Sequence, residues 1–243
     1  MKGIKKKGKT AIKTFSSVEE ALYFQKLYNS FEQHVKVEQT GNTVQYPFVQ
    51  GITLEKYLQT NSSVETIYNA LGAILQKAHA PAFSTIENYD KVCMSRELFT
   101  PISAFEKCTG YKGNIHGDLT TKNILIKEDE SIVLIDRLRE TGDLLFDFSF
   151  IMSSLGLFYE TDQTNQLHAI DSFFDTYLSD SPFDVDNFFT AFRNNFLNYA
   201  HFIAKTDFYE TLPFQEWVHV EAIAKDLMQY KTFTHYLSAL QRK

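Results

Sequence analysis

The stretch from Ile115 to Asp136 constrains the fold more than any other part of the chain. It reads IHGDLTTKN, then the apolar run ILI, the charged segment KEDES and a second apolar run, IVLI, which ends at Asp136. Two short apolar runs on either side of a charged turn predict a β-hairpin. Because a hairpin returns its ends to one place, Asp118 and Asn123 before it should lie close to Asp136 after it.

These three polar side chains suit phosphoryl transfer. One carboxylate can orient an attacking hydroxyl or accept its proton, while another carboxylate and an amide oxygen hold Mg²⁺ on the phosphates. The alternative is a polar turn beside a buried hairpin, with acidic side chains that only cap backbone groups. An H-G-D run, an Asn five residues after its Asp and an apolar strand that ends in Asp favour the chemical interpretation.

The segment and the residues after it resemble the catalytic loop of the aminoglycoside phosphotransferase and choline kinase-like superfamily, which has the protein-kinase fold. The matching residues are His116, Gly117, Asp118, Leu119, Asn123, Ile124, Leu125, Ile135, Asp136, Gly142, Asp143 and Asp147. The resemblance implies ATP as the phosphate donor, Asp118 as the catalytic base, and Asn123 and Asp136 as ligands of Mg²⁺. A weaker likeness to kinases found alongside surface-polysaccharide synthesis implies a sugar as acceptor, with an amino alcohol or an aminoglycoside as alternatives. Asp143 and Asp147 precede helix-like sequence, so we predict structural roles for both.

The chain before and after this segment predicts an α+β fold with two lobes. Residues 1–51 contain a predicted strand at Thr10–Phe15, a helix that follows Ser16 and Ser17, and two strands within Val35–Gln50. Ser16 and Glu19 have the spacing of a capping box at the start of that helix. Residues 52–243 are mostly helical in pattern, with helices at Leu54–Gln59 and Val64–Ala80 and again after Phe146. We therefore predict a small β-rich lobe and hinge over 1–51 and a helical lobe with the catalytic loop over 52–243.

The resemblance extends to the small lobe and implies the nucleotide contacts. Lys13 in A-I-K has the form of the phosphate-binding lysine, and Glu20 is its expected partner on the helix, with Glu19 as the alternative. The segment VQYPFVQG resembles the hinge between the lobes, which implies that the carbonyl of Pro47 and the amide of Val49 face adenine.

The start of the chain departs from the superfamily pattern. A strand, a glycine-bearing phosphate loop and a second strand normally precede the lysine, whereas only twelve residues precede Lys13 here. We therefore expect either a truncated small lobe or a remade phosphate loop. The lysines of MKGIKKKGK are either a solvated terminus or a cluster that faces phosphates. Residues 3–10 formally match a P-loop, but no buried strand precedes them and strand-like sequence follows, so we reject that interpretation.

Composition and charge limit the remaining functions. The net charge of −6 argues against a general nucleic-acid binder, and no apolar run approaches eighteen residues, so we expect no membrane span. Two cysteines and no recognisable signal peptide lead us to expect a cytoplasmic protein. Only six residues separate Asp136 from Asp143, too few for a peptide-binding activation segment, so we expect a small-molecule acceptor. The rivals are a catalytically inactive pseudokinase and a minimal protein kinase, and the oligomeric state is not predicted.

Overall fold

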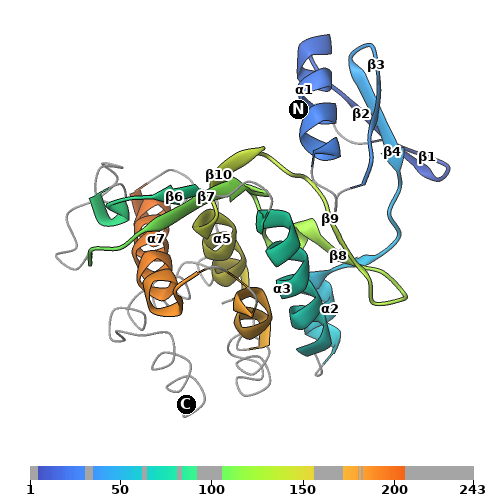
Figure 1. Cartoon of the computed structure of the whole chain (residues 1–243). Helices are drawn as coiled ribbons and strands as arrows, with labels where there is room; N and C mark the ends of the chain where they lie inside the picture. Colours follow the sequence, from blue (N-terminus) through green and yellow to red (C-terminus); the bar gives the residue numbers. More distant parts are fainter. Residues whose placement is uncertain are drawn as a thin grey trace.

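The computed structural model describes residues 5–30, 35–61, 65–80, 84–91, 106–155, 172–179, 181 and 183–205. Its small lobe is an antiparallel sheet with one helix beside it (Figure 1). The sheet has the order β1-β2-β4-β3. Its strands are β1 (Lys5–Lys7), β2 (Thr10–Thr14), β3 (Glu38–Thr40) and β4 (Thr43–Pro47), and the helix is α1 (Val18–Asn29).

Alternation along β2 positions the predicted phosphate-binding lysine. Ala11 and Lys13 are buried, whereas the residues between and beside them are only half-buried, so both side chains lie on the sheet face that packs against α1. That face is closed by a small apolar cluster whose members are Ala21, Phe24, Tyr28, Val37 and Val44. The lobe therefore has a core of its own, and Lys13 lies at its margin.

Helix α1 begins one residue later than the serine-glutamate spacing first indicated. Ser17 is the N-cap, and its side chain accepts a hydrogen bond from the backbone N–H of Glu20 at 3.2 Å. The carboxylate of Glu20 in turn accepts from the backbone N–H of Ser16 at 3.1 Å. A capping arrangement at Ser17 and Glu20 thus replaces the one expected at Ser16 and Glu19.

The large lobe combines helices with two three-stranded sheets. The helices with full bounds are α2 (Leu54–Thr60), α3 (Glu65–His79), α5 (Leu145–Leu155) and α7 (Val185–Lys205), and residues 172–178 are also helical. One sheet has the order β5-β8-β9, with β5 (Ile52–Thr53), β8 (Ile124–Ile126) and β9 (Ile132–Leu134). The other has the order β10-β7-β6, with β10 (Thr141–Asp143), β7 (Gly110–Asn114) and β6 (Ser84–Ile86).

The hairpin predicted from the two apolar runs is confirmed. Strands β8 and β9 pair antiparallel, with Ile124 opposite Leu134 and Ile126 opposite Ile132. A short 3₁₀ helix over Thr121–Asn123 leads into β8. The carbonyl of Asn123 accepts the backbone N–H of Ile135 at 2.9 Å, so the residue before the first strand lies beside the end of the second.

A single stretch of chain joins the lobes after β4. It ends where β5 pairs with β8, and Gly51 lies against that strand: a Cβ at Gly51 would lie 2.7 Å from the carbonyl oxygen of Ile126. The second apolar cluster lies entirely in the large lobe and includes residues of α2, α3, β8, α5 and α7. The α+β fold with a small β-rich lobe and a larger, mostly helical lobe is therefore confirmed, while the exact boundary at residues 51 and 52 stays a prediction. Within the described residues, no helix is long and apolar enough to cross a membrane.

Candidate active site

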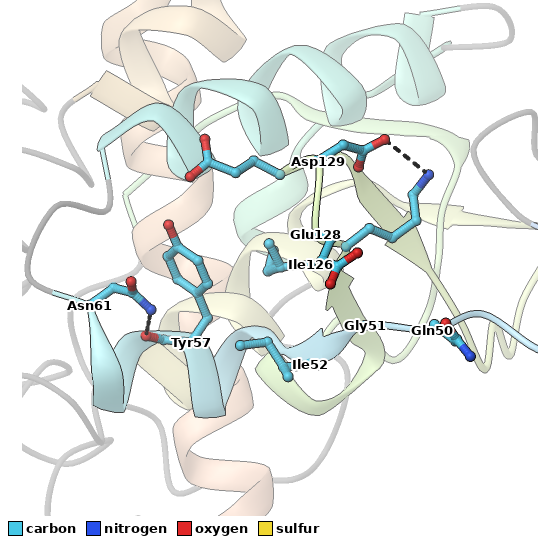
Figure 2. Close-up of a pocket in the computed structure, with 10 residues that line it drawn as sticks. Gln50, Gly51, Ile52, Tyr57, Asn61, Ile126, Glu128 and Asp129 are labelled. Atoms are coloured by element: carbon cyan, nitrogen blue, oxygen red, sulfur yellow. Dashed lines mark hydrogen bonds and ion pairs between the residues drawn. The ribbon is translucent and has the colours of Figure 1, made fainter.

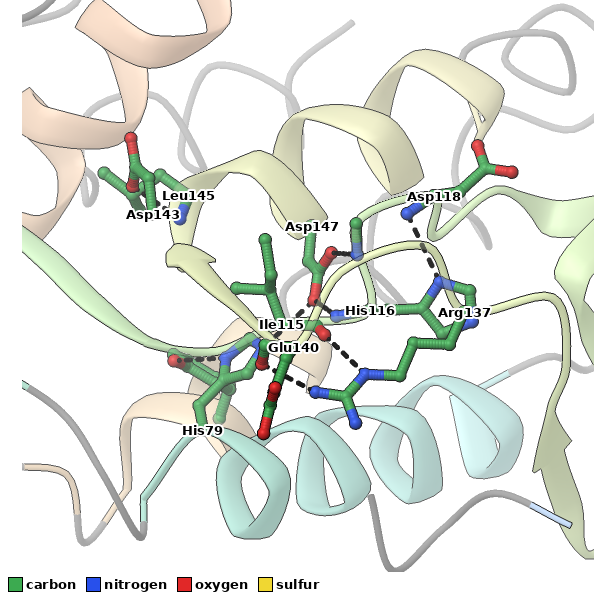
Figure 3. A network of polar contacts seen from close by, with 11 residues as sticks. His79, Ile115, His116, Asp118, Arg137, Glu140, Asp143, Leu145 and Asp147 are labelled. Atoms are coloured by element: carbon green, nitrogen blue, oxygen red, sulfur yellow. Dashed lines mark hydrogen bonds and ion pairs between the residues drawn. The ribbon is translucent and has the colours of Figure 1, made fainter. Parts of the chain in front are cut away.

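One buried carboxylate, that of Asp147 on α5, holds the backbone of the loop that carries Asp118. Its two oxygens accept the backbone N–H groups of His116 at 2.7 Å and Gly117 at 2.8 Å (Figure 3). His79 at the end of α3 donates to the same carboxylate through Nε2 at 3.2 Å. Burial raises the pKa of Asp147, but the hydrogen bond and charge of His79 and the contacts of His116 outweigh it, so the pKa lies below its usual range. Asp147 is thus a charged support for the loop, in line with its predicted structural role.

The conformation of the loop depends on Gly117 and on the neutral ring of His116. Gly117 has φ +80°, a value that glycine adopts most easily. The Nε2 of His116 donates to the carbonyl of Ile135 at 2.8 Å, which leaves Nδ1 to accept the backbone N–H of Asp118 at 3.3 Å. Burial lowers the pKa of His116, which favours this neutral form. The ring therefore ties the loop to the residue just before Asp136.

Asp118 and Asn123 lie in direct contact, as the sequence predicted. The side-chain amide of Asn123 donates to the carbonyl oxygen of Asp118 at 2.8 Å and to its Oδ2 at 2.9 Å. Burial raises the pKa of the half-buried Asp118 carboxyl, the bond from Asn123 opposes the rise, and the charges of Asp136 and Asp147 add to it. Figure 3 shows this carboxylate turned away from the network around Asp147.

Asp136 brings the two lobes together at the end of the hairpin. It has φ +56°, in the left-handed region that side chains other than glycine rarely adopt. Its Oδ1 lies 3.6 Å from Nζ of Lys13 on β2, and it accepts a hydrogen bond from the hydroxyl of Tyr28 on α1 at 3.3 Å. A strained residue over-determined by contacts from two other elements is typical of a functional position.

The expected ion pair between Lys13 and Glu20 is not formed. Glu20 is exposed at the start of α1, where its carboxylate accepts from the backbone and hydroxyl of Ser16 at 3.1 and 2.6 Å. Lys13 instead lies 4.5 Å from the ring centroid of Phe24, one turn further along α1, and pairs with Asp136. The local cap is satisfied within the first turn, so Glu20 has a nearer partner than the lysine.

The predicted hinge residues follow the last strand of the small lobe. Pro47 is exposed and pairs in register with Thr10, and Val49 is half-buried in the crossing between the lobes. Between them the backbone N–H of Phe48 donates to the carbonyl of Lys9 at 2.8 Å, and Nζ of Lys6 lies 4.0 Å from the Phe48 ring centroid. The roles of Pro47 and Val49 toward adenine stay predictions, and the first lysines form β1 rather than a frayed end.

The donor set fits a magnesium ion that is also bound by phosphates. No group of three or more His, Cys, Asp and Glu side chains in the described ranges is arranged to hold a metal by itself. Mg²⁺ is usually held by only one or two protein oxygens together with substrate phosphates and water. Because the amide nitrogen of Asn123 is used on Asp118, its oxygen is available, and Asp136 is partly exposed nearby.

Asp143 is a second buried acid, but it belongs to the packing beneath β10 and α5. It accepts from the backbone N–H of Leu145 at 3.0 Å, from the amide of Asn195 at 2.9 Å and from the hydroxyl of Tyr89. Burial raises its pKa to about 7. These contacts tie α7 to the start of α5, which is the structural role predicted for this residue.

Two residues with contacts to the site were not singled out from the sequence. The hydroxyl of Tyr28 donates a hydrogen bond to Asp136. The next residue after Asp136, Arg137, has a buried guanidinium that donates to Leu27 on α1 and to Ile115 at the start of the loop. The helical period of α1 identified the buried face that includes Tyr28, but nothing local indicated which residue it would reach. The position of Arg137 after Asp136, the predicted metal ligand, was visible, while its partners Leu27 and Ser30 lie more than a hundred residues away in the chain.

A pocket of about 750 Å³ lies apart from these residues (Figure 2). It is lined by Gln50–Ile52, by α2 residues such as Tyr57, and by the charged turn between β8 and β9. None of the predicted site residues lines it, so it is not the predicted nucleotide site.

Comparison with known proteins shows a likeness in structure without a match in sequence. No protein-family model matches the chain, and no curated protein matches it. A choline/ethanolamine kinase family protein from Mesorhizobium loti superposes with a TM-score of 0.60 at 11% identity, over 99% of this chain and 89% of that one. Choline kinase LicA from Streptococcus pneumoniae superposes with a TM-score of 0.53 at 15% identity, over 93% of this chain and 89% of that one.

The likeness agrees with the order of elements and with the geometry around the loop. Three features occur here in the chain order that the resemblance implies. They are a lysine on a small-lobe strand, a loop held by a buried aspartate, and an aspartate at the end of a hairpin. The chain therefore has the two-lobed, protein-kinase-like fold that these two solved structures share.

Proposed function

We propose that the protein is an ATP- and Mg²⁺-dependent phosphotransferase that acts on a hydroxyl of a small molecule. The observation that carries this proposal is the meeting of Lys13 and Asp136 across the lobes, 3.6 Å apart, beside the hydrogen-bonded pair of Asp118 and Asn123. Phosphoryl transfer needs positive charge on the phosphates, oxygen ligands for a metal and a carboxylate at the attacking hydroxyl. These groups come from three segments of the chain, namely strand β2, the loop that carries Asp118 and Asn123, and the end of the hairpin.

Each residue has a distinct part in the proposed reaction. Lys13 neutralises phosphate charge, and the backbone of Pro47 and Val49 binds adenine. Asn123 and Asp136 hold Mg²⁺, which when bound neutralises charge on the phosphate oxygens. Asp118 orients the acceptor hydroxyl and receives its proton, and its contact with Asn123 keeps base and metal ligand in one arrangement. Most of the rate then comes from positioning and electrostatics.

The short link between Asp136 and α5 favours a small acceptor. Six residues separate Asp136 from Asp143, and β10 already begins within them at Thr141. A protein substrate would need another surface on which to lie, which makes the minimal protein kinase the weaker candidate. The sequence favours a sugar, whereas the similar solved structures are kinases of choline and ethanolamine type, so amino alcohols belong in the first panel.

Turnover by wild type and by Asp118→Asn tests the proposal. We expect Mg²⁺-dependent ATP consumption with at least one sugar or amino alcohol, and a loss of about 100-fold or more in the variant, which is the scale of removing general base catalysis. ATP-induced thermal stabilisation should survive in the variant, because Asp118 is not assigned to nucleotide binding. Equal background turnover of both proteins across the panel would favour the pseudokinase, and label transferred mainly to added proteins would favour the protein kinase.

A further inference from the structure

Arg137 makes an unusually complete set of contacts for a residue beside a metal-binding aspartate. Its side chain is 1% exposed. Nη1 donates to the carbonyl of Leu27 at 2.8 Å and to Oγ of Ser30 at 2.9 Å, both in the last turn of α1. Nε donates to the carbonyl of Ile115 at 2.8 Å, and Nη2 to the carbonyl of Glu140 at 2.7 Å. One guanidinium therefore joins the end of α1 to Ile115 at the start of the catalytic loop and to Glu140 on its own segment. Figure 3 shows Arg137 beside Ile115 and Glu140.

The chemistry of this contact requires arginine. The last carbonyls of a helix lack partners within it, and a cation there also interacts favourably with the helix dipole. The planar guanidinium offers five donors in fixed directions, whereas a lysine ammonium is a compact charge that cannot reach three carbonyl groups at once. Replacement of Arg137 by lysine would keep the charge and lose most of these bonds.

The held end of α1 carries the side chains that face Asp136. Tyr28 lies between the two positions that Arg137 contacts, and its hydroxyl donates to Asp136. Phe24, one turn earlier, lies under the ammonium of Lys13. Glu20 at the other end of α1 takes no part in holding the lysine.

We propose that Arg137 is a positioning residue that sets α1, and through it Tyr28 and Lys13, against Asp136. It thereby takes the part that a helix glutamate would play in the resembled family. This inference rests on the proposed function for its effect on metal and nucleotide, but the attachment of α1 to the large lobe can be measured without turnover.

Three variants separate positioning from general loss of stability. Arg137→Lys removes most of the bonds, and Tyr28→Phe removes only the hydroxyl that reaches Asp136. Lys26→Ala is the matched control, because the exposed ion pair of Lys26 with Glu140, at 3.3 Å, joins the same two segments without touching Asp136. Surface pairs of this kind contribute little.

Amide hydrogen exchange of the nucleotide-free protein gives the first readout. In Arg137→Lys we expect exchange at the C-terminal turn of α1 to rise at least about 10-fold relative to β8, with no such change in Tyr28→Phe or Lys26→Ala. Unchanged exchange in the arginine variant would overturn the inference, whether or not the wild type turns over ATP. Absence of turnover in the wild type would refute the proposed function alone.

The metal dependence of nucleotide binding gives the second readout. With AMP-PNP as probe, Arg137→Lys and Tyr28→Phe should each raise the Mg²⁺ concentration for half-maximal binding about 10-fold or more, the scale for losing an outer partner of a metal ligand. The KM of the acceptor should stay unchanged where turnover is measured. A fall in kcat with unchanged Mg²⁺ dependence would show only a smaller folded fraction and would contradict the positioning role.

Discussion

Removal of the carboxylate of Asp147 is the most direct test of how the loop is held. In Asp147→Ala, the backbone N–H groups of His116 and Gly117 and the Nε2 of His79 lose a common acceptor. Asp147 is fully buried, so water does not replace it in the native arrangement. A buried donor left without an acceptor costs about 1–3 kcal/mol, and Asp147→Ala leaves three such donors.

We therefore expect Asp147→Ala to lower the free energy of unfolding by about 3–5 kcal/mol, the lower part of the range that three such donors give together. For a chain of this size that corresponds to a fall in Tm of about 6–20 °C. Urea denaturation gives the free energy, and thermal scans give Tm. The amides of His116 and Gly117 should also exchange about 100-fold faster, since each 1.36 kcal/mol is a factor of ten.

Asp143→Ala is the matched control for this experiment. Asp143 is also a buried acid with several donors, but none of those donors belongs to the loop at His116–Asp118. Its removal should destabilise the fold without selectively exposing the loop amides. Loss of less than about 1 kcal/mol in Asp147→Ala, the usual effect of an average substitution, would refute the account of the loop given above. Equal exchange at the loop in both variants would refute it as well.

Three further substitutions test other parts of the structure. Lys13→Met keeps the aliphatic stem but removes the charge opposite Asp136, so kcat should fall about 100-fold or more, as for loss of one preorganised charge, while the exposed Lys26→Met should leave kcat unchanged. Gly117→Ala should destabilise the fold by about 1–2 kcal/mol from the left-handed backbone alone. Contact with Arg139, whose Cγ would lie 2.9 Å from the new Cβ, should add to that cost. Gly41 has φ +59° and open space around it, so urea denaturation of Gly41→Ala measures the backbone cost without the contact cost. The pKa of Asp143 is raised from 3.8 to about 7, so the folded state binds this proton more tightly than the unfolded state does. The protonated carboxyl therefore stabilises the fold fully below about pH 4, and this stabilisation is lost as the pH rises toward 7. Asp143→Asn should remove that decline between pH 4 and 7, and the same slope in variant and wild type would show that another group causes it.

Much of the site could be predicted because its pieces are local in the chain. Asp118 and Asn123 are five residues apart, and the apolar runs of the hairpin fix where Asp136 must return. The strand of Lys13 showed clear alternation. In each case, a pattern among residues close together in the chain was enough to predict which side chains meet in the folded protein.

The strands that the sequence did not indicate lack such a pattern. β1 is three lysines, β7 reads GYKGN and β10 reads TGD, so no apolar alternation marks them, and Thr141 is their only β-branched residue. Their conformation follows from pairing with partners: β1 pairs with β2, and β10 with β7. Strand formation of this kind depends on tertiary context more than on intrinsic preference.

Glu20 shows how a family pattern can be overridden by local chemistry. The sequence placed a glutamate where a partner for Lys13 was expected, but it also placed serines three and four residues earlier. A carboxylate in the first turn of a helix is stabilised by the unpaired N–H groups there, and the cost in side-chain entropy is small because the donors are adjacent. The short-range contact therefore prevails over one that must cross to the neighbouring strand.

Because Glu20 does not pair with Lys13, α1 contacts the large lobe through its C-terminal end instead. Phe24 and Tyr28 lie on the turns after Glu20, and Arg137 holds the final turn. The segment that holds α1 is then the one that carries Asp136, the proposed metal ligand, and leads directly into β10. Because only six residues join Asp136 to Asp143 and one of them is the buried Arg137, this segment cannot move away from α1 without breaking the hydrogen bonds of Arg137 to Leu27 and Ser30. We therefore expect α1 and Asp136 to move as one unit, so that binding of nucleotide, rather than rearrangement of an activation segment, completes the site.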